Sequence, residues 1–376
     1  MAKKDINHSI DLDIKKIAFV SDMHLQIDDS SDGVSYLNSV NTQLIQASFA
    51  DIKASGVDLV ILCGDNTNSG RTTQHDSLKE ILAELKKDCQ VLVVFGNHDI
   101  SEVDKDHLPE VYGDYGYDIA FSKDEKSLSY SVLYNDLMVI ILDTNNEDKW
   151  EISYPKFQKE TLLWLENELN YGKDNNKKVI CVGHYPIITR QKEDFLQQEE
   201  ILNLFNKYDV PLYDCGHLHY HAVSEKADVK EVVISQTTSY PVFYELMEIS
   251  GDKAMLYPKK VDVEKWAKEN KITNEKLLNF DEYLNKQYRK KCVDIISSLC
   301  IDKQIEKEEL NLAIDLFTKV MMYRSDGSLS LHIEEINNHE GYQIFQEISK
   351  GTIWNTWIPL VLSEACKDTM GFTINF

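Results

Sequence analysis

Five short apolar runs in this chain each end in a cluster of aspartate, asparagine or histidine. The third run, over residues 90–95, is rich in β-branched residues and is followed at once by Gly96-Asn97-His98-Asp99. Such a run predicts a buried strand, and glycine lets the backbone turn sharply where the strand ends. Polar side chains at the carboxyl end of a strand occupy the position where open α/β sheets bind their ligands. The tetrapeptide alone is a weak signal, because a turn with a capping aspartate would also explain it.

The same pattern recurs at the other four predicted strand ends. The polar residues at the five ends are Asp22 and His24, Asp65, Asn97 and His98, His184, and His217 and His219. Apolar residues at helical spacing separate the runs, and this alternation predicts an α/β sheet whose strand ends share one edge. In an extended segment, residues i and i+2 point to the same side. We therefore expect Asp22 and His24 to converge on one point, and the same argument applies to His217 and His219.

So many hard or borderline donors at one edge of a sheet would repel one another without a cation. Imidazole, carboxylate and amide oxygen suit Mn, Fe or Zn, and the set lacks the thiolates of a structural zinc site. The set is too large for one four-coordinate ion. It fits two ions about 3.5–4 Å apart that share one carboxylate, the arrangement used for phosphoryl displacement.

The ordered set of motifs resembles the calcineurin-like metallophosphoesterase superfamily. The blocks are Asp-x-His at 22–24, Gly-Asp at 64–65, Gly-Asn-His-Asp at 96–99, Gly-His at 183–184 and Gly-His-x-His at 216–219. Each block is common by chance, but the ordered set is specific, and the resemblance covers roughly residues 15–260. Aspartate in the fourth place of Gly-Asn-His-Asp is similar to the class III cyclic nucleotide phosphodiesterase branch. The resemblance implies an α/β fold, a four-layer α/β/β/α sandwich with the site at the sheet edges.

The resemblance also implies a role for each matching residue. It places Asp22, His24 and His219 on a first metal, Asp65 between two metals, and Asn97, His184 and His217 on the second. It implies that His98 is not a ligand but helps to protonate the leaving oxygen, with Asp99 orienting its ring. The implied nucleophile is a hydroxide that bridges the metals, without a covalent enzyme intermediate. The chain departs from the common pattern at Asn66, where an apolar residue is usual. Histidines outside the blocks, such as His75 and His221, are expected on the surface or in loops.

The net charge narrows the classes of binding partner, and the cysteine content indicates the cellular compartment. Lys and Arg number 40 and Asp and Glu 63, so the formal net charge is −23. A chain this acidic should repel nucleic acid polymers and anionic membrane surfaces. The seven cysteines form no Cys-x-x-Cys pair, which favours a reducing cytoplasm over a disulfide framework. No run approaches the roughly 20 apolar residues of a membrane span, and no apolar signal segment follows the first residues.

The length of 376 residues suggests two domains. We place the boundary near 260, with a metallophosphoesterase catalytic domain over 1–260 and a small all-helical domain over 261–376. The short strands expected between 220 and 259 predict an antiparallel meander that closes a sheet. The helical domain has no catalytic cluster of its own, and we expect it to act either as a lid that sets substrate size or as a homodimer interface.

Together these features predict a cytoplasmic, dinuclear phosphoesterase that hydrolyses a small phosphodiester, with a 3′,5′-cyclic nucleotide as the first expectation. The alternative is a phosphomonoesterase or a serine/threonine phosphoprotein phosphatase that uses the same metals. A metal-binding interaction protein without catalysis is a third reading. His98 and Asp99 argue against it, since metal binding alone does not need them.

Overall fold

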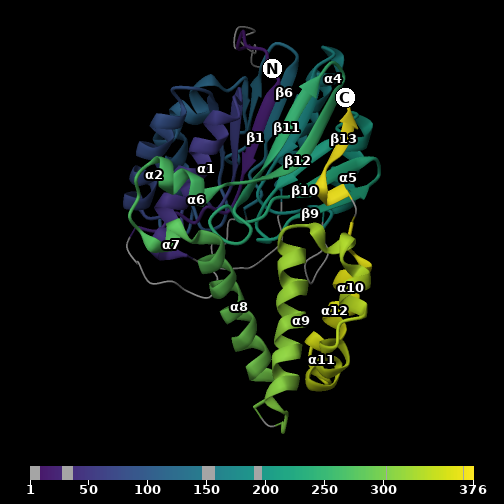
Figure 1. Cartoon of the computed structure of the whole chain (residues 1–376). Helices are drawn as coiled ribbons and strands as arrows, with labels where there is room; N and C mark the ends of the chain where they lie inside the picture. Colours follow the sequence, from purple (N-terminus) through teal and green to yellow (C-terminus); the bar gives the residue numbers. More distant parts are fainter. Residues whose placement is uncertain (1–8, 28–36, 146–156, 190–196, 302, 367) are drawn as a thin grey trace.

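The computed structural model describes residues 9–27, 37–145, 157–189, 197–301, 303–366 and 368–376. It confirms the predicted α/β sandwich, in which two sheets pack face to face and helices cover their outer faces (Figure 1). Among the described helices, none is long and apolar enough to cross a lipid bilayer.

The first sheet has the strand order β13-β12-β11-β1-β2-β3. Its strands are β1 (Lys16–Val20), β2 (Leu59–Cys63), β3 (Gln90–Val94), β11 (Phe243–Ser250), β12 (Lys253–Lys260) and β13 (Phe372–Asn375). Because β1, β2 and β3 are parallel, their carboxyl ends meet at one edge of the sheet, as the sequence predicts. The other strands of this sheet add to it in antiparallel fashion.

The second sheet has the order β4-β5-β6-β7-β8-β10-β9. Its strands are β4 (Ser122–Lys123), β5 (Tyr130–Leu133), β6 (Leu137–Ile141), β7 (Lys178–Val182), β8 (Leu212–Cys215), β9 (Ala222–Lys226) and β10 (Val229–Val233). The prediction of one meander over 220–259 is wrong. The β9–β10 hairpin belongs to this sheet, with β10 parallel to β8, whereas the β11–β12 hairpin lies in the first sheet.

Helices occupy the segments between the strands, as the apolar spacing predicts. They are α1 (Asn41–Ala54), α2 (Thr72–Leu85), α3 (Leu108–Val111), α4 (Lys159–Asp174) and α5 (Gln198–Lys207). Short 3₁₀ turns lie at Asn38–Val40, Lys105–His107, Gly113–Tyr115, Tyr117–Ile119, Ser328–Leu331 and Asp368–Met370. Helices α1 and α2 pack on the first sheet, and α4 and α5 pack on the second (Figure 1).

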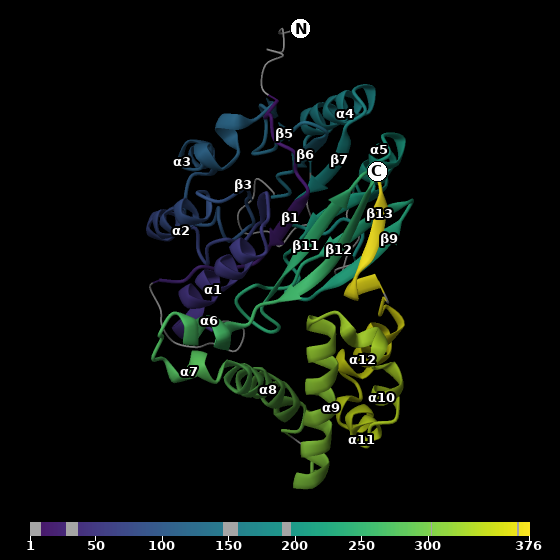
Figure 2. The same ribbon diagram turned by 45° about the horizontal axis from the view of Figure 1, so that its top comes forward.

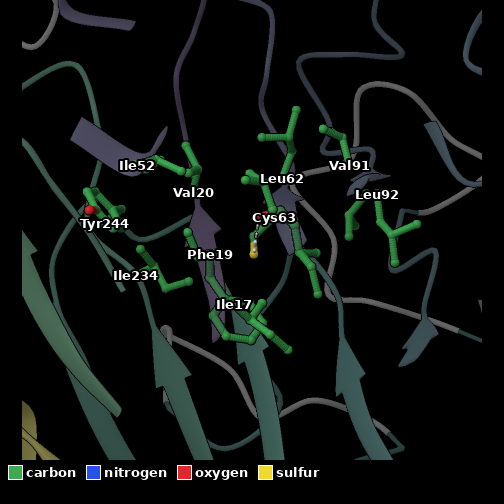
Figure 3. Packing of buried hydrophobic residues seen from close by; sticks show 14 of the residues in the cluster. Ile17, Phe19, Val20, Ile52, Leu62, Cys63, Val91, Leu92, Ile234 and Tyr244 are labelled. Carbon is green, nitrogen blue, oxygen red and sulfur yellow. Dashed lines mark hydrogen bonds between the residues drawn. The ribbon is translucent and has the colours of Figure 1, made fainter. Parts of the chain in front are cut away.

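The main core lies between the two sheets and extends under α1. Phe19, Val20, Leu62 and Cys63 from the central strands are fully buried there, and Ile234 reaches them from the segment after β10 (Figure 3). Strands buried on both faces read as continuous apolar runs, which is why the sequence shows them so plainly.

The C-terminal part is helical, as predicted. Its helices are α6 (Val263–Glu269), α7 (Glu275–Leu278), α8 (Phe280–Leu299), α9 (Lys307–Ser325), α10 (Ile333–Asn337), α11 (Gly341–Ser349) and α12 (Trp354–Ser363). Helices α8 to α12 project from one end of the sandwich in both views (Figures 1 and 2). They share a core of their own around Phe317, Phe345 and Ile358.

Two segments of this part belong physically to the catalytic sandwich. Val263, Leu277, Phe280 and Leu284 are buried in the same core cluster as β1 and β2. The chain then returns at its end, where β13 pairs antiparallel with β12. The expectation of an all-helical segment after 260 therefore misses this last strand.

Candidate metal centre

The structure brings the predicted ligands together at the carboxyl ends of β1, β2, β3, β7 and β8. Two groups of donor atoms form there, each with its atoms within 4.8 Å of one another. The first group is Asp22, His24, Asp65 and His219, and the second is Asp65, His184 and His217. Asp65 belongs to both groups, which is the division that the sequence resemblance implies.

The first group is compact and almost wholly buried. His24 Nε2 lies 3.0 Å from His219 Nε2, and Asp22 Oδ1 lies 3.2 Å from the same His219 nitrogen. Burial lowers the pKa of His24 to about 3. Burial alone would raise the pKa of Asp22, but His219 and His184 together outweigh burial and lower the pKa to about 2. A neutral imidazole and an ionised carboxylate are the protonation states that bind cations.

In the second group, a hydrogen bond fixes the ring of His184, and the side-chain oxygen of the neighbouring Asn97 is buried without a hydrogen-bond partner in the described residues. His184 Nδ1 lies 2.9 Å from the carbonyl oxygen of Cys63, so Nδ1 carries a proton. His184 Nε2 lies 3.3 Å from Asp65 Oδ2. Burial alone would lower the pKa of His184, but this carboxylate outweighs burial and raises the pKa to about 9. Asn97 Oδ1 is buried, and no hydrogen-bond partner reaches it from the described part of the chain. Because a buried, unpaired acceptor is costly, this oxygen fits a cation ligand, and the donor set as a whole fits transition metals.

The backbone at these ligands is left-handed. The φ angles are 50° at Asp22, 42° at His24, 49° at Asp65, 69° at His217 and 56° at His219. The prediction that alternate residues of an extended segment converge is therefore wrong in its physical reason. The first pair still meets at one group, whereas the two later histidines enter different groups. Non-glycine residues adopt this conformation at a cost, and such residues tend to cluster at functional sites.

His98 stands beside the donor groups without joining either of them in the described residues. Its Nδ1 lies 2.6 Å from the carbonyl oxygen of Asn68, and its Nε2 lies 4.0 Å from Asp65 Oδ2. The side chain is 35% exposed, so it is accessible to a substrate. Since a carbonyl only accepts, Nδ1 holds its proton there and Nε2 is the atom that can exchange one.

Asp99 does not orient the ring of His98, and that prediction is wrong. Its buried carboxylate instead accepts hydrogen bonds from Gly96 N at 2.9 Å, Thr67 N at 2.8 Å and Asn66 Nδ2 at 3.1 Å. Asp99 therefore ties the loop after β2 to the loop after β3. The polar Asn66 joins the same two regions, because its Nδ2 also donates to the carbonyl oxygen of Val94, the last residue of β3, at 2.8 Å.

Two glycines allow these loops to approach one another. A Cβ at Gly96 would meet the Asp65 carboxylate and the His184 imidazole. Gly64 has a φ of +94°, and a Cβ there would meet the His184 ring. Both positions therefore exclude side chains for a spatial reason.

Several residues beside the predicted ligands have contacts that sequence reasoning did not assign. Ser21 Oγ donates to Asp22 Oδ2 at 2.6 Å, and the ring of Tyr185 lies 4.1 Å from the ring of His217, centroid to centroid. His75 was expected on the surface but is only 2% exposed, with its Nε2 3.0 Å from the carbonyl oxygen of Asp99. His221, expected there too, is also buried. No local motif marks His75 and His221, because their partners Asp99 and Thr369 are distant in sequence.

Comparison with protein families agrees with this geometry. Residues 15–221 match the model of the calcineurin-like phosphoesterases. Residues 262–368 match the model of the C-terminal domain of cyclic nucleotide phosphodiesterase. The fold and the site define a metallophosphoesterase, and the chain belongs to the calcineurin-like phosphoesterase family.

Two curated relatives carry phosphodiesterase names. A probable glycerophosphodiester phosphodiesterase of Arcobacter nitrofigilis is 30% identical over 224 residues, which is 57% of this chain and 76% of the relative. A probable cyclic nucleotide phosphodiesterase of Coxiella burnetii is 29% identical over 212 residues, 54% of this chain and 75% of the relative. Among solved structures, a dimetal phosphatase from Danio rerio superposes with a TM-score of 0.55 at 14% identity, covering 66% of this chain and 96% of its own. At that identity the likeness shows the fold alone.

Proposed function

We propose that this metallophosphoesterase hydrolyses a small phosphodiester at two cations that share Asp65, with a 3′,5′-cyclic nucleotide as the first candidate. The observation that carries the proposal is the membership of Asp65 in both donor groups. Two ions with a common carboxylate can hold both the attacking and the leaving oxygen of an in-line displacement.

Each ligand has a defined place in this proposal. Asp22, His24 and His219 would hold one ion, Asn97, His184 and His217 the other, and Asp65 both. Mn, Fe or Zn suit these donors. When bound, the ions supply Lewis acidity toward the phosphoryl oxygens and lower the pKa of the water that attacks phosphorus. The neutral imidazole of His24 and the ionised Asp22 are ready for this role without a change of protonation.

His98 would donate the proton that the leaving oxygen needs. The Asn68 carbonyl holds Nδ1–H and fixes the ring, so the second proton sits on Nε2, the atom nearer Asp65. A positioned general acid is needed most when the leaving group is a poor one, such as a sugar alkoxide. Retention of this arrangement supports catalysis over a silent metal-binding scaffold.

The preference for diesters is supported by the relatives. Both are named as phosphodiesterases, and the C-terminal model is that of a cyclic nucleotide phosphodiesterase. The phosphomonoesterase or phosphoprotein phosphatase alternative uses the same metal ligands, so substrate tests must separate them.

Location and assembly are further parts of the proposal. The cytoplasm is supported by seven free cysteines in the described residues, and the net charge of −23 supports a small substrate over a nucleic acid polymer or a membrane. A homodimer through the C-terminal helices is supported by Ile353 and Leu360, which are 74% and 52% exposed at α12. The mass of the full chain in solution tests this part.

The direct test is hydrolysis by metal-free protein reconstituted with Mn²⁺. The substrates are bis(p-nitrophenyl) phosphate, p-nitrophenyl phosphate and 3′,5′-cAMP, with Asp65→Asn as the matched variant. We expect turnover of both diesters and a loss of roughly a hundredfold in the variant, since a neutral amide replaces the carboxylate common to both ions. Turnover of the monoester alone would favour the phosphatase, and no turnover of any of the three would contradict the proposal.

A further inference from the structure

A cavity of about 190 Å³ lies between the catalytic sandwich and the C-terminal helices, directly beside the metal centre. His219, a donor of the first group, is among its lining residues, so the cavity and the metal site share a wall. Tyr240 and Gln236 line it from the segment between β10 and β11, and Tyr288 and Lys291 line it from α8. Helix α9 contributes Arg324.

The hydroxyl groups of Tyr240, Tyr288 and Ser325 in this cavity are already engaged within the protein. Tyr240 donates from its phenol oxygen to Asp326 Oδ2 at 2.9 Å. The phenol oxygen of Tyr288 lies 2.6 Å from Ser325 Oγ. These groups therefore shape the wall, and they are poor candidates for recognising a ligand.

Three further side chains of the wall can donate hydrogen bonds to a ligand, namely those of Gln236, Lys291 and Arg324. Gln236 is 3% exposed, and its buried Nε2 finds no hydrogen-bond partner within the described ranges. Lys291 and Arg324 add two cationic groups, and the guanidinium of Arg324 lies 3.8 Å from the centroid of the Tyr220 ring, which holds its plane. Burial lowers the pKa of Lys291, as expected for an ammonium group in a partly desolvated wall. An unpaired buried donor is costly until an acceptor arrives.

We propose that Gln236, Lys291 and Arg324 form a subsite that binds the acceptor-rich substituent of the diester substrate. This inference rests on the proposed function, because the subsite acts on a substrate whose phosphate lies at the metal centre. Both cations come from helices beyond residue 262, so the C-terminal region sets substrate preference by chemistry rather than by size alone.

Two kinds of substituent offer this acceptor chemistry. Guanine presents two acceptors, O6 and N7, on one edge, whereas adenine presents a donor beside its N7. A carboxylate presents two charged oxygens that match lysine and arginine. The subsite predicts that at least one of these is preferred over its counterpart without the acceptor.

Matched substrate pairs test the inference with the full, metal-loaded chain. The first pair is 3′,5′-cGMP and 3′,5′-cAMP. The second is glycerophosphoserine and glycerophosphoethanolamine, which differ by one carboxylate. The ratio of kcat/KM within each pair is measured for the wild type, for Lys291→Met and for Gln236→Leu. The control is Lys290→Met, an exposed neighbour on the same helix.

We expect the wild type to favour the acceptor-bearing member of at least one pair by on the order of tenfold, a span typical of lost polar contacts in a binding site. Both variants should bring that ratio toward one, and Lys290→Met should keep it. Because a ratio cancels any general loss of active protein, a fold defect cannot imitate this result. Turnover of diesters with ratios near one in the wild type, or with ratios unchanged in the variants, overturns the subsite alone. No turnover of any diester overturns the proposed function and the subsite with it.

Discussion

The carbonyl oxygen of Asn68 decides which proton His98 can transfer. It accepts from Nδ1 at 2.6 Å, so the ring cannot turn without losing that hydrogen bond, and Nε2 stays on the side of Asp65. A histidine held in this way is a general acid whose position does not depend on the substrate.

At the residue scale we predict that His98→Ala lowers kcat for cyclic nucleotides by roughly 10²–10⁴. The loss for bis(p-nitrophenyl) phosphate should be smaller, because p-nitrophenolate leaves without a proton. Bound metal, measured by elemental analysis, should be unchanged, since His98 belongs to neither donor group. The exposed His107→Ala serves as the control. Equal losses for both substrates, or loss of metal, would contradict the role of His98.

The grouping of the donor residues was predictable, but their local geometry was not. Asp65 and His184 follow apolar strands directly, so sequence alone places both at strand ends. The expectation of one shared sheet edge is wrong, because β2 and β7 belong to different sheets whose carboxyl ends meet at the site. The left-handed backbone at Asp22 is set by contacts across the sheet, such as its amide donating to the carbonyl oxygen of Gly64 at 3.0 Å. The partners of Asp99 also come from another loop, and a motif cannot reveal them.

At the element scale, strand β13 completes the edge of the first sheet. Phe372 and Ile374 face inward and are buried, whereas Thr373 and Asn375 face solvent. This alternation is the period of a half-buried strand, and the strand anchors the end of the C-terminal region to β12.

We predict that Ile374→Ala lowers the free energy of unfolding by about 2–4 kcal/mol, because it removes a buried branched side chain. Thr373→Ala, on the exposed face of the same strand, should change it by less than about 0.5 kcal/mol. Urea unfolding followed by circular dichroism measures both. Equal effects of the two substitutions would show that β13 does not pack as described.

The sequence did not predict which strands belong to which of the two sheets. The alternation within 222–233 and 243–260 predicts hairpins, but it does not say which sheet each hairpin joins. That choice depends on the pairing of β10 with β8 and of β11 with β1, and the second pairing joins segments at opposite ends of the chain. Strand β13 pairs Asn375 with Lys253, and no short-range turn joins the two strands to reveal the pairing.

At the scale of the whole molecule, the packing boundary does not coincide with the predicted boundary near 260. The C-terminal family match starts at residue 262, yet Leu277, Phe280 and Leu284 are buried in the catalytic core. An amphipathic helix reveals that it has an apolar face, but not which core covers that face.

We therefore predict that a chain cut after residue 262 does not fold. The cut removes four side chains from the catalytic core, Val263, Leu277, Phe280 and Leu284. Burial of each side chain stabilises the fold by about 1.5–3 kcal/mol. The four contributions together are comparable with the free energy of unfolding of a typical domain. A matched variant deletes 287–367 and joins the ends with a flexible linker. It keeps those residues and β13, and it should melt cooperatively in a thermal scan. A soluble 1–262 fragment with a cooperative transition would contradict this packing.

The return of β13 also bears on how the protein is made. Strand β13 covers the outer edge of β12, and of the described strands it leaves the ribosome last. During synthesis β12 therefore exposes an unpaired edge with which other chains can pair. Open edges of this kind seed aggregation unless charges or proline guard them. Strand β12 carries Lys253, Pro258, Lys259 and Lys260, which are such guards. A cell that stalls translation just before Phe372 would thus accumulate a nearly complete sandwich whose remaining protection against aggregation lies in three lysines and a proline.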